Sequence, residues 1–315
     1  MIIERDEPVG LRAHYCDCMK SRWSAANLPR LDGKRIVVTG ATNGLGWETA
    51  RGLARVGADV VLAVRDVDRG KERAAEIAAD TPGAHAEVVE LDVADLSSVR
   101  RCAAGLGDID VLVNNAGVMA REHAFTVDGF ETSFGTNFLG PFALTNLLLP
   151  RIRDRVVIVG SSSHKAGQIH LDDPHFERRD WSRPAAYAQS KLADMLWGLE
   201  LDRRLRKSGS LTSTAISHPG WATTGILGVT GVRAIDSVIS AAGRILANTP
   251  AEGAAITMRA LTPDIPSGSY VGPDGPFGLR GRPVLVGRSP AACDIRTAGL
   301  LWELAEFATD TRYRL

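Results

Sequence analysis

The stretch Thr39-Gly40-Ala41-Thr42-Asn43-Gly44-Leu45-Gly46 separates a short apolar run from a segment with helical periodicity. The run 35–39 predicts a buried strand, and the segment 45–56, which stops before Gly57, predicts a helix. Glycines between a strand and a helix let the backbone approach a pyrophosphate, which the free N–H groups at the helix start can bind. We therefore predict a dinucleotide-binding loop made of Gly40, Thr42, Asn43, Gly44, Leu45 and Gly46. The alternative is a glycine-rich turn without a ligand.

The same alternation of strand and helix continues along the chain. Apolar runs predict further strands at 59–64, 86–90, 109–113, 155–159 and 212–216. Segments of helical composition predict helices at 68–79, 96–104, 137–149 and 185–206. Because these strands are apolar throughout and alternate with helices, they predict a parallel sheet that helices cover on both faces.

The last third of the chain is expected to complete this sheet. Residues 269–271 predict a last edge strand, and residues 290–308 predict a surface helix. Because no linker separates two blocks, we predict one α/β domain over 34–315, a Rossmann-type doubly wound parallel sheet flanked by helices. Residues 1–33 are expected to form an N-terminal extension, and the region around 225–265 is expected to form a lid over the site.

Composition and charge narrow the classes of function. The 315 residues (33.7 kDa) contain 37 Lys plus Arg and 37 Asp plus Glu, so the formal net charge is zero. This balance gives no electrostatic reason to expect nucleic-acid binding. Residues 1–20 mix charged with apolar residues, and no run of 18 or more apolar residues occurs, so we expect neither a signal peptide nor an integral membrane segment.

The cysteines and histidines do not predict a metal site. The four cysteines are Cys16, Cys18, Cys102 and Cys293. Cys16 and Cys18 could bind a metal as a pair, but no second pair follows at zinc-site spacing, so two reduced thiols are favoured. The histidines show no ligand spacing either. Such sparse cysteine is typical of the reducing cytoplasm.

Tyr187 and Lys191 lie four residues apart in the predicted helix 185–206. Residues at this spacing share one face of a helix. A neighbouring ammonium favours the phenolate form of a tyrosine, so this pair suits proton transfer to a carbonyl, or from an alcohol, near neutral pH. The alternative for a Tyr-x-x-x-Lys pattern on its own is a packed surface tyrosine.

Together these motifs resemble the short-chain dehydrogenase/reductase family. The resemblance rests on the Gly-x-x-x-Gly-x-Gly spacing after Thr39, on Asn114-Asn115-Ala116-Gly117 after a strand, and on Tyr187-Ala-Gln-Ser-Lys191. It implies a Rossmann-type fold and an oxidoreductase that transfers hydride between a nicotinamide cofactor and a carbonyl or alcohol. The long gap between Ser161 and Tyr187, with His164-Lys165-Ala-Gly167 inside it, resembles the retinol-dehydrogenase-like and protochlorophyllide-reductase-like branches.

The end of the second strand, Ala63-Val64-Arg65-Asp66, bears on the choice of cofactor. A carboxylate there would bond the ribose 2′-OH of NAD and repel a 2′-phosphate. NAD-preferring members of the family carry an acidic residue where this chain has Val64, whereas the Arg65 guanidinium can pair with the 2′-phosphate of NADP. We therefore predict NADP(H) over NAD(H). Asp66 is the contrary observation, and a solvated charge is the alternative for Arg65.

The resemblance implies further contacts to the cofactor. The positions that match the family's contacts are Asp92, Val93, Asn115, Ala116, Gly117, Tyr187, Lys191, Pro219, Gly220 and Thr224. The family's Asp at the place of Asp92 contacts the adenine amino group, whereas Asp95 suits a helix cap. The first Asn of the pair at 114–115 ties neighbouring strands in the family. A hydroxyl at Thr224 can bond the carboxamide, and His218 is expected to be structural.

The resemblance also assigns catalytic residues. Tyr187 exchanges the proton, Lys191 supports it and binds the ribose, and Asn137 orders a water that relays protons from the lysine toward solvent. A serine just past the fifth strand holds the substrate oxygen, and counting from the strand favours Ser161, with Ser162 as the alternative. A buried amide that bonds the backbone is a compatible role for Asn137.

Apolar residues in the expected lid, between Gly225 and Ala247, indicate a hydrophobic substrate such as a retinoid, steroid or long-chain aldehyde. A helix that packs on the core or on a partner explains these residues equally well. The resemblance implies a small-molecule carbonyl or alcohol substrate and a homodimer or homotetramer. The rival hypothesis is a non-catalytic NADP-binding regulator or scaffold.

Overall fold

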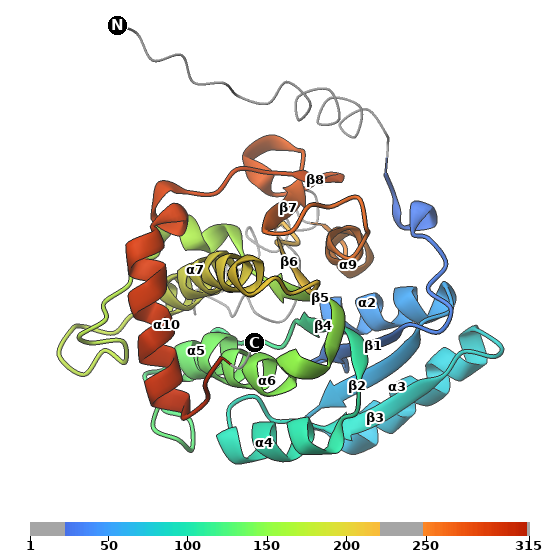
Figure 1. Cartoon of the computed structure of the whole chain (residues 1–315), viewed down its shortest axis with the longest axis horizontal. Helices are drawn as coiled ribbons and strands as arrows, with labels where there is room; N and C mark the ends of the chain where they lie inside the picture. The colour runs from blue at the N-terminus through green and yellow to red at the C-terminus, as the bar shows by residue number, and fades with distance from the viewer. Residues whose placement is uncertain (1–22, 221–247, 314–315) are drawn as a thin grey trace, which may run out of the picture.

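Eight strands form one sheet in the structure, a computed structural model that describes residues 23–220 and 248–313 (Figure 1). The strands are β1 (Arg35–Thr39), β2 (Asp59–Val64), β3 (Ala86–Glu90), β4 (Ile109–Asn114), β5 (Ile152–Val159), β6 (Ser213–Ser217), β7 (Ser269–Pro273) and β8 (Pro283–Leu285). Their order across the sheet is β3-β2-β1-β4-β5-β6-β7-β8. Neighbouring strands pair in parallel except β7 and β8, which are antiparallel. The doubly wound, mostly parallel sheet that the sequence predicts is confirmed.

Helices cover both faces of this sheet. They are α2 (Gly44–Arg55), α3 (Val67–Asp80), α4 (Leu96–Gly105), α6 (Gly140–Leu148), α7 (Arg183–Ser208), α9 (Pro250–Ala260) and α10 (Ile295–Thr309). One face of the sheet, with Val38 and Leu62, packs in a cluster with side chains of α2, α3 and α9. The other face, with Val37 and Leu112, packs with α4, α6, α7 and α10. Because successive strand residues point to opposite faces, a strand covered on both sides is apolar at every position.

The chain changes its direction across the sheet between β1 and β4. From β1 it steps outward to β2 and β3, returns past β1 to β4, and continues to β5 and β6. Ile36 of β1 pairs with Val60 on one side and with Val111 on the other, so the carboxyl ends of β1, β2 and β4 meet at one edge. In open parallel sheets, ligands bind in the crevice at this reversal.

Short polar side chains cap the N-termini of the helices that follow β2 and β3. Asp66 accepts a hydrogen bond from the N–H of Arg69 at the start of α3, and Asp95 accepts one from the N–H of Ser97 at the start of α4. Ser182 caps α7 in the same way. These bonds satisfy N–H groups of the first helical turn, which have no partner within the helix. The predicted capping role of Asp95 is therefore confirmed.

Two predicted elements differ from the structure. The predicted edge strand at 269–271 is not at the edge, because β8 pairs with β7 on its outer side. The predicted helix at 137–149 begins within a π-helical segment, Gly135–Leu139, that leads from the short α5 (Thr132–Phe134) into α6. Such π-helical turns inside helices occur frequently at functional sites.

Part of the predicted N-terminal extension packs on the body of the structure. Trp23 and Leu28 are buried in the same cluster as α2 and α9, and the Arg259 guanidinium lies 5.6 Å from the centre of the Trp23 ring. Cys16, Cys18 and the part of the predicted lid before residue 248 lie outside the described residues. In the two described ranges, none of the helices has the length and apolar character needed to cross a bilayer.

Candidate active site

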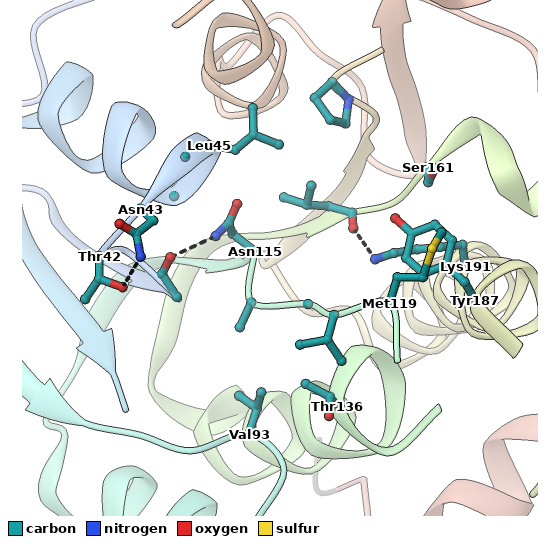
Figure 2. A pocket seen from close by; sticks show the side chains of 18 of the residues that line it. Thr42, Asn43, Leu45, Val93, Asn115, Met119, Thr136, Ser161, Tyr187 and Lys191 are labelled. Carbon is teal, nitrogen blue, oxygen red and sulfur yellow. Dashed lines mark hydrogen bonds between the residues drawn. The ribbon is translucent and has the colours of Figure 1, made fainter. Parts of the chain in front are cut away.

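A cavity of about 950 Å³ opens at the carboxyl ends of the parallel strands, where the chain reverses its direction across the sheet (Figure 2). Thr42, Asn43 and Leu45 of the glycine loop line it at one end, Ser161, Tyr187 and Lys191 line it at the other, and Arg65 is also on its wall. This volume lies within the range of small-molecule and cofactor sites. The fold therefore brings into one cavity motifs that lie far apart in the sequence.

Most of the predicted site residues line this cavity. They are Gly40, Thr42, Asn43, Gly44, Leu45, Gly46, Arg65, Asp92, Val93, Asn115, Ala116, Gly117, Ser161, Ser162, Tyr187, Lys191, Pro219 and Gly220. Asn137 is not on the wall but contacts residues that are, as described below. Thr224 lies outside the described residues.

The glycine loop needs glycine at Gly40 and Gly46 for two different reasons. Gly40 has a φ of +67°, in the left-handed region that other residues rarely adopt. A Cβ on Gly46 would lie 2.3 Å from Asn115 Nδ2 and 2.5 Å from Gly40 O. A side chain at either position would displace the turn. Because Gly40 and Gly46 have no side chains, a phosphate can approach the loop backbone beside the N-terminus of α2.

Hydrogen bonds between the ends of β1 and β4 hold this loop in place. Thr39 Oγ1 accepts from the N–H groups of Asn115, at 3.0 Å, and Ala116, at 2.9 Å. Asn115 Nδ2 donates to Thr39 O at 2.8 Å, so the second Asn of the motif ties the two strands together. The first, Asn114, was expected to have that role but donates to Thr145 Oγ1 of α6 at 3.0 Å. The expectation was wrong because Asn114 turns toward the helix layer that covers the sheet.

Two arginine side chains, those of Arg65 and Arg69, lie at the end of β2. The Arg65 side chain is 79% exposed, and its Nη1 lies 3.8 Å from Asp92 Oδ2. Arg69, in the first turn of α3, also lines the cavity and donates to Asn43 Oδ1 at 2.8 Å. The Asp66 carboxylate is engaged as the cap of α3. Two guanidinium groups therefore face this end of the cavity, and such an end suits an anionic group.

Asp92 and Val93 form the wall beyond β3. Asp92 Oδ1 accepts from the N–H of Ala94 at 2.9 Å, which fixes the carboxylate beside the cavity. Val93 lies against the start of α6, where a Cβ on Gly140 would come within 1.9 Å of Val93 O. Glycine at this position therefore lets α6 and the Val93 backbone approach each other closely.

Tyr187 and Lys191 come from adjacent turns of α7 and both line the cavity (Figure 2). Both are buried, and Lys191 Nζ lies 5.9 Å from the centre of the Tyr187 ring. Lys191 Nζ donates to Val159 O at 3.0 Å and to Asp194 Oδ2 at 2.8 Å. Burial by itself would lower the pKa of Lys191, but Asp194 and Tyr187 together outweigh burial, and the pKa is raised. The lysine is therefore an ammonium at neutral pH.

Three consecutive serines, Ser161, Ser162 and Ser163, line the cavity beyond β5. Ser161 Oγ accepts from the N–H of Ser163 at 3.2 Å and donates to Ser163 Oγ at the same distance. His164 Nδ1 lies 2.7 Å from Ser161 O. These contacts fix Ser161 on the side of the cavity where Tyr187 lies (Figure 2).

Asn137 lies behind the cavity wall, in the π-helical segment before α6. Its Oδ1 accepts from the N–H of Val118 at 2.7 Å, and its Nδ2 donates to Val118 O and to Ser190 Oγ, both at 2.8 Å. Ser190 Oγ donates in turn to Tyr187 O at 2.8 Å. Asn137 therefore links the loop after β4 to the helix that carries Tyr187, which is the buried, backbone-bonding role that the sequence also allowed.

Pro219 and Gly220 line the cavity beyond β6, and the neighbouring His218 is buried. His218 Nδ1 accepts from the N–H of Gly220 at 3.1 Å, which holds the backbone turn. Burial lowers the pKa of His218 to about 4, so the ring is neutral at neutral pH. These contacts agree with the expected structural role of His218.

Sequence reasoning missed several residues of the wall. They include Arg69, Met119, Arg121, Arg183, Pro250 and Leu279. Helical spacing could have found some of the missed groups, since Arg183 lies one turn before Tyr187, and Asp194 lies three positions after Lys191. Leu279 carries no such signal, because the segment between β7 and β8 reaches the cavity only through the fold.

Known proteins resemble this chain in sequence. A family model described as short chain dehydrogenase matches residues 34–173. Human retinol dehydrogenase 13 is 43% identical over 217 residues, which cover 66% of this chain and 64% of the relative. The chain thus aligns with less than two thirds of the length of that relative.

Solved structures share the fold. The crystal structure of an uncharacterised protein from Mycobacterium paratuberculosis has a TM-score of 0.82 and 45% identity, and the match covers 94% of this chain and 100% of that chain. A short chain dehydrogenase from Burkholderia cenocepacia, solved in complex with NADP, has a TM-score of 0.60 and 26% identity over 76% of this chain and 96% of that chain. The glycine loop and the Tyr187–Lys191 pair meet in one cavity of such a fold, and the chain is similar to the short-chain dehydrogenase family over residues 34–173.

Proposed function

We propose that this chain is an oxidoreductase that transfers hydride between NADP(H) and a carbonyl or alcohol substrate. The observation that carries the proposal is the single cavity in which the glycine loop, Ser161, Tyr187 and Lys191 meet. A bound nicotinamide would supply the hydride chemistry, and the protein supplies position and electrostatics.

The chain's own side chains would handle the proton and the substrate oxygen. Tyr187 gives a proton to a carbonyl oxygen, or takes one from an alcohol. Lys191, an ammonium beside the Tyr187 ring, binds the ribose and supports the proton exchange. Ser161 holds the substrate oxygen, with Ser162 as the alternative. Asn137 takes part in a water relay from the lysine toward solvent.

The charge at the end of β2 supports NADP(H) over NAD(H). Arg65 and Arg69 line that end of the cavity, and Asp66 is engaged in capping α3. A 2′-phosphate would therefore meet two guanidinium groups, and the Asp66 carboxylate, which also lines the cavity, is held at one oxygen by the N–H of Arg69. The glycine loop would hold the pyrophosphate, and Asp92 would contact the adenine. The structural relative from Burkholderia cenocepacia was solved in complex with NADP.

The proposed substrate is hydrophobic, of the retinoid, steroid or long-chain aldehyde class. Two observations support it: the 43% identity to a protein named retinol dehydrogenase, and the apolar side chains of Met119 and Leu279 on the cavity wall. Arg121 and Arg183 also line the cavity and could meet a polar group at one end of such a substrate.

The test is a turnover assay with matched carbonyl compounds. We would mix the purified protein with NADPH and, in turn, all-trans-retinal, decanal and the polar aldehyde glyceraldehyde, and follow NADPH absorbance, with NADH in parallel. Turnover of the apolar aldehydes with NADPH is the expected result. NADPH binding without turnover of any carbonyl would favour the rival function, a regulator or scaffold. Binding of neither nucleotide would overturn the proposal.

A cytoplasmic location and a homodimer or homotetramer complete the proposal. Cys102 and Cys293 form no disulfide within the described residues, which is consistent with a reducing compartment. Light scattering after size-exclusion chromatography tests the assembly. A monomer at micromolar concentration would contradict the oligomer.

A further inference from the structure

Asp194 is a buried carboxylate beside Lys191, and the proposed hydride and proton transfer assigns it no role. Its side chain is 1% exposed, and that of Lys191 is 7% exposed. Asp194 Oδ2 accepts from Lys191 Nζ at 2.8 Å, across one turn of α7. Asp194 Oδ1 makes no hydrogen bond in the part of the chain that the structure describes. Burying such an ion pair is costly, and the pair by itself is weak evidence of a gain in stability.

We propose that Asp194 is a positioning residue whose carboxylate holds the Lys191 side chain as an ammonium against Val159 O, ready to bind the cofactor ribose beside Tyr187. This inference rests on the proposed function. An ammonium has three hydrogens to donate. Asp194 and Val159 O take two of them, so the position of Nζ is fixed and one hydrogen remains for the cavity.

Few other charges act on this pair. Within the described ranges, Lys191 interacts electrostatically with Asp194 and Tyr187, and Asp194 interacts only with Lys191. The facing elements contribute uncharged groups, namely the Val159 carbonyl of β5 and the Asn137 amide; a Cβ on Gly117 would lie within 4 Å of both Asn137 Oδ1 and Lys191 Nζ. The charge of Lys191 therefore depends on Asp194 more than on any other group.

Removing the carboxylate would leave the burial of Lys191 opposed only by the weaker interaction with Tyr187. Burial lowers the pKa of an amine, and Asp194 is the main group that raises the pKa of Lys191 against it. Burial also raises the pKa of Asp194 to about 6, so the group is a carboxylate at pH 7 and above. Without it, Lys191 is expected to lose its proton within the weakly alkaline range, where the wild-type lysine keeps it.

The experiment measures the dissociation constant of NADPH by nucleotide fluorescence from about pH 6.5 to about pH 9.5. The variants are Asp194→Asn and Asp194→Ser, which lack the charge, Asp194→Glu, which keeps it, and Lys191→Met, which removes the amine. Glu200→Gln is the matched control. Glu200 is a buried carboxylate further along α7 that pairs with Arg203 and Arg204 and does not contact Lys191.

We expect Asp194→Asn to bind NADPH like the wild type near neutral pH. Its affinity should then fall about tenfold with rising pH toward that of Lys191→Met, which binds weakly at every pH. The wild type, Asp194→Glu and Glu200→Gln should keep a flat profile. If Asp194→Asn does not fold, Asp194→Ser provides the same test.

Two outcomes would overturn the inference, and they are distinguishable. If Lys191→Met weakens NADPH binding but the neutral Asp194 variants keep a flat profile, Asp194 does not control the lysine, while the proposed function stands. If Lys191→Met binds NADPH like the wild type at every pH, the lysine is not at the cofactor. The proposed function then fails together with the inference.

Discussion

Asp66 Oδ1 accepts a hydrogen bond from the backbone N–H of Arg69 at 3.0 Å, and this contact begins α3. In the sequence alone, Asp66 is the observation that argues against NADP(H). As a helix cap, its carboxylate is turned to the first turn of its own helix. Arg65 and Arg69 are then the groups that can meet a 2′-phosphate. A local capping contact thus supports one cofactor over the other.

Arg65→Ala is expected to weaken NADPH binding about 10- to 100-fold and to leave NADH binding unchanged, because only NADPH carries the 2′-phosphate. Fluorescence titration with each nucleotide measures the effect. Lys71→Ala is the control, since it removes a positive charge of α3 that pairs with Asp68 outside the cavity. Equal losses for both nucleotides would show that Arg65 does not meet the phosphate.

Tyr187→Phe is expected to lower turnover at least about 100-fold and to spare NADPH binding, because it removes the hydroxyl that exchanges the proton and keeps the ring. Steady-state assays and a nucleotide titration on the same preparation measure the two effects. Tyr313→Phe, far along the chain beside Trp302, serves as the control. Unchanged turnover in Tyr187→Phe would sink the catalytic assignment.

Ser161→Ala and Ser162→Ala together identify the serine that holds the substrate oxygen. Loss of a hydroxyl that bonds the reacting oxygen typically lowers turnover about 100- to 1,000-fold. We expect that loss for Ser161→Ala and a much smaller one for Ser162→Ala. The reverse pattern in kcat would transfer the role to Ser162, although both residues line the cavity.

Gly46→Ala is expected to lower the free energy of unfolding by about 1–3 kcal/mol and to weaken NADPH binding. Its Cβ would lie 2.3 Å from Asn115 Nδ2 and 2.5 Å from Gly40 O, so the loop must move. Urea denaturation measures the stability. Gly105→Ala is the control, because no atom lies within 4 Å of a Cβ there; it should raise stability by about 0.5–1 kcal/mol. Equal effects of the two changes would contradict a tight loop.

Acid is expected to destabilise the fold through His218. Its pKa is about 4 in the folded protein, against an ordinary value of 6.5, so between these pH values the unfolded chain binds a proton that the folded chain does not. The contribution of His218 is therefore fully present above pH 6.5 and is lost as the pH falls toward 4. The expected loss is about 3 kcal/mol.

His218→Asn tests this expectation, because an amide oxygen can still accept from the N–H of Gly220 but does not titrate. Asp194, whose pKa is raised to about 6, acts in the opposite direction, so the measured quantity is the difference between wild type and variant. That difference should shrink as the pH falls. A wild-type minus variant difference in the free energy of unfolding that stays constant from pH 7 to pH 4, measured by urea denaturation, would contradict the expectation. The control is His123→Asn, at an exposed site, and an equally large change of its difference with pH would also contradict the expectation.

Sequence patterns located the first strands well and the last one poorly. The strands at 35–39 and 59–64 lie where the pattern predicts them, because a strand covered on both faces is apolar at each position and ends at polar or glycine residues. β8, Pro283–Leu285, is too short to carry any periodicity, so the prediction of residues 269–271 as the edge strand was wrong. Which of two adjacent asparagines ties β1 to β4 depends on the direction each side chain takes, and the pattern does not contain that direction.

The sequence by itself determined the features that depend on short spacings. The glycine loop follows from the positions of Gly40, Gly44 and Gly46 between a strand and a helix, and the shared face of Tyr187 and Lys191 follows from the helical repeat. Such features arise within one or two turns of chain, so residue order is enough to predict them.

Only the tertiary structure decided what surrounds these groups. The bond from Asn115 to Thr39 and the arrival of Leu279 at the cavity join residues of separate elements, and the packing of other elements on α7 buries the pair of Lys191 and Asp194. The physical reason is that charge, hydration and close contact depend on every neighbour in space. Most of those neighbours are distant in sequence, and they come together only when the strands pair and the helices pack on the sheet.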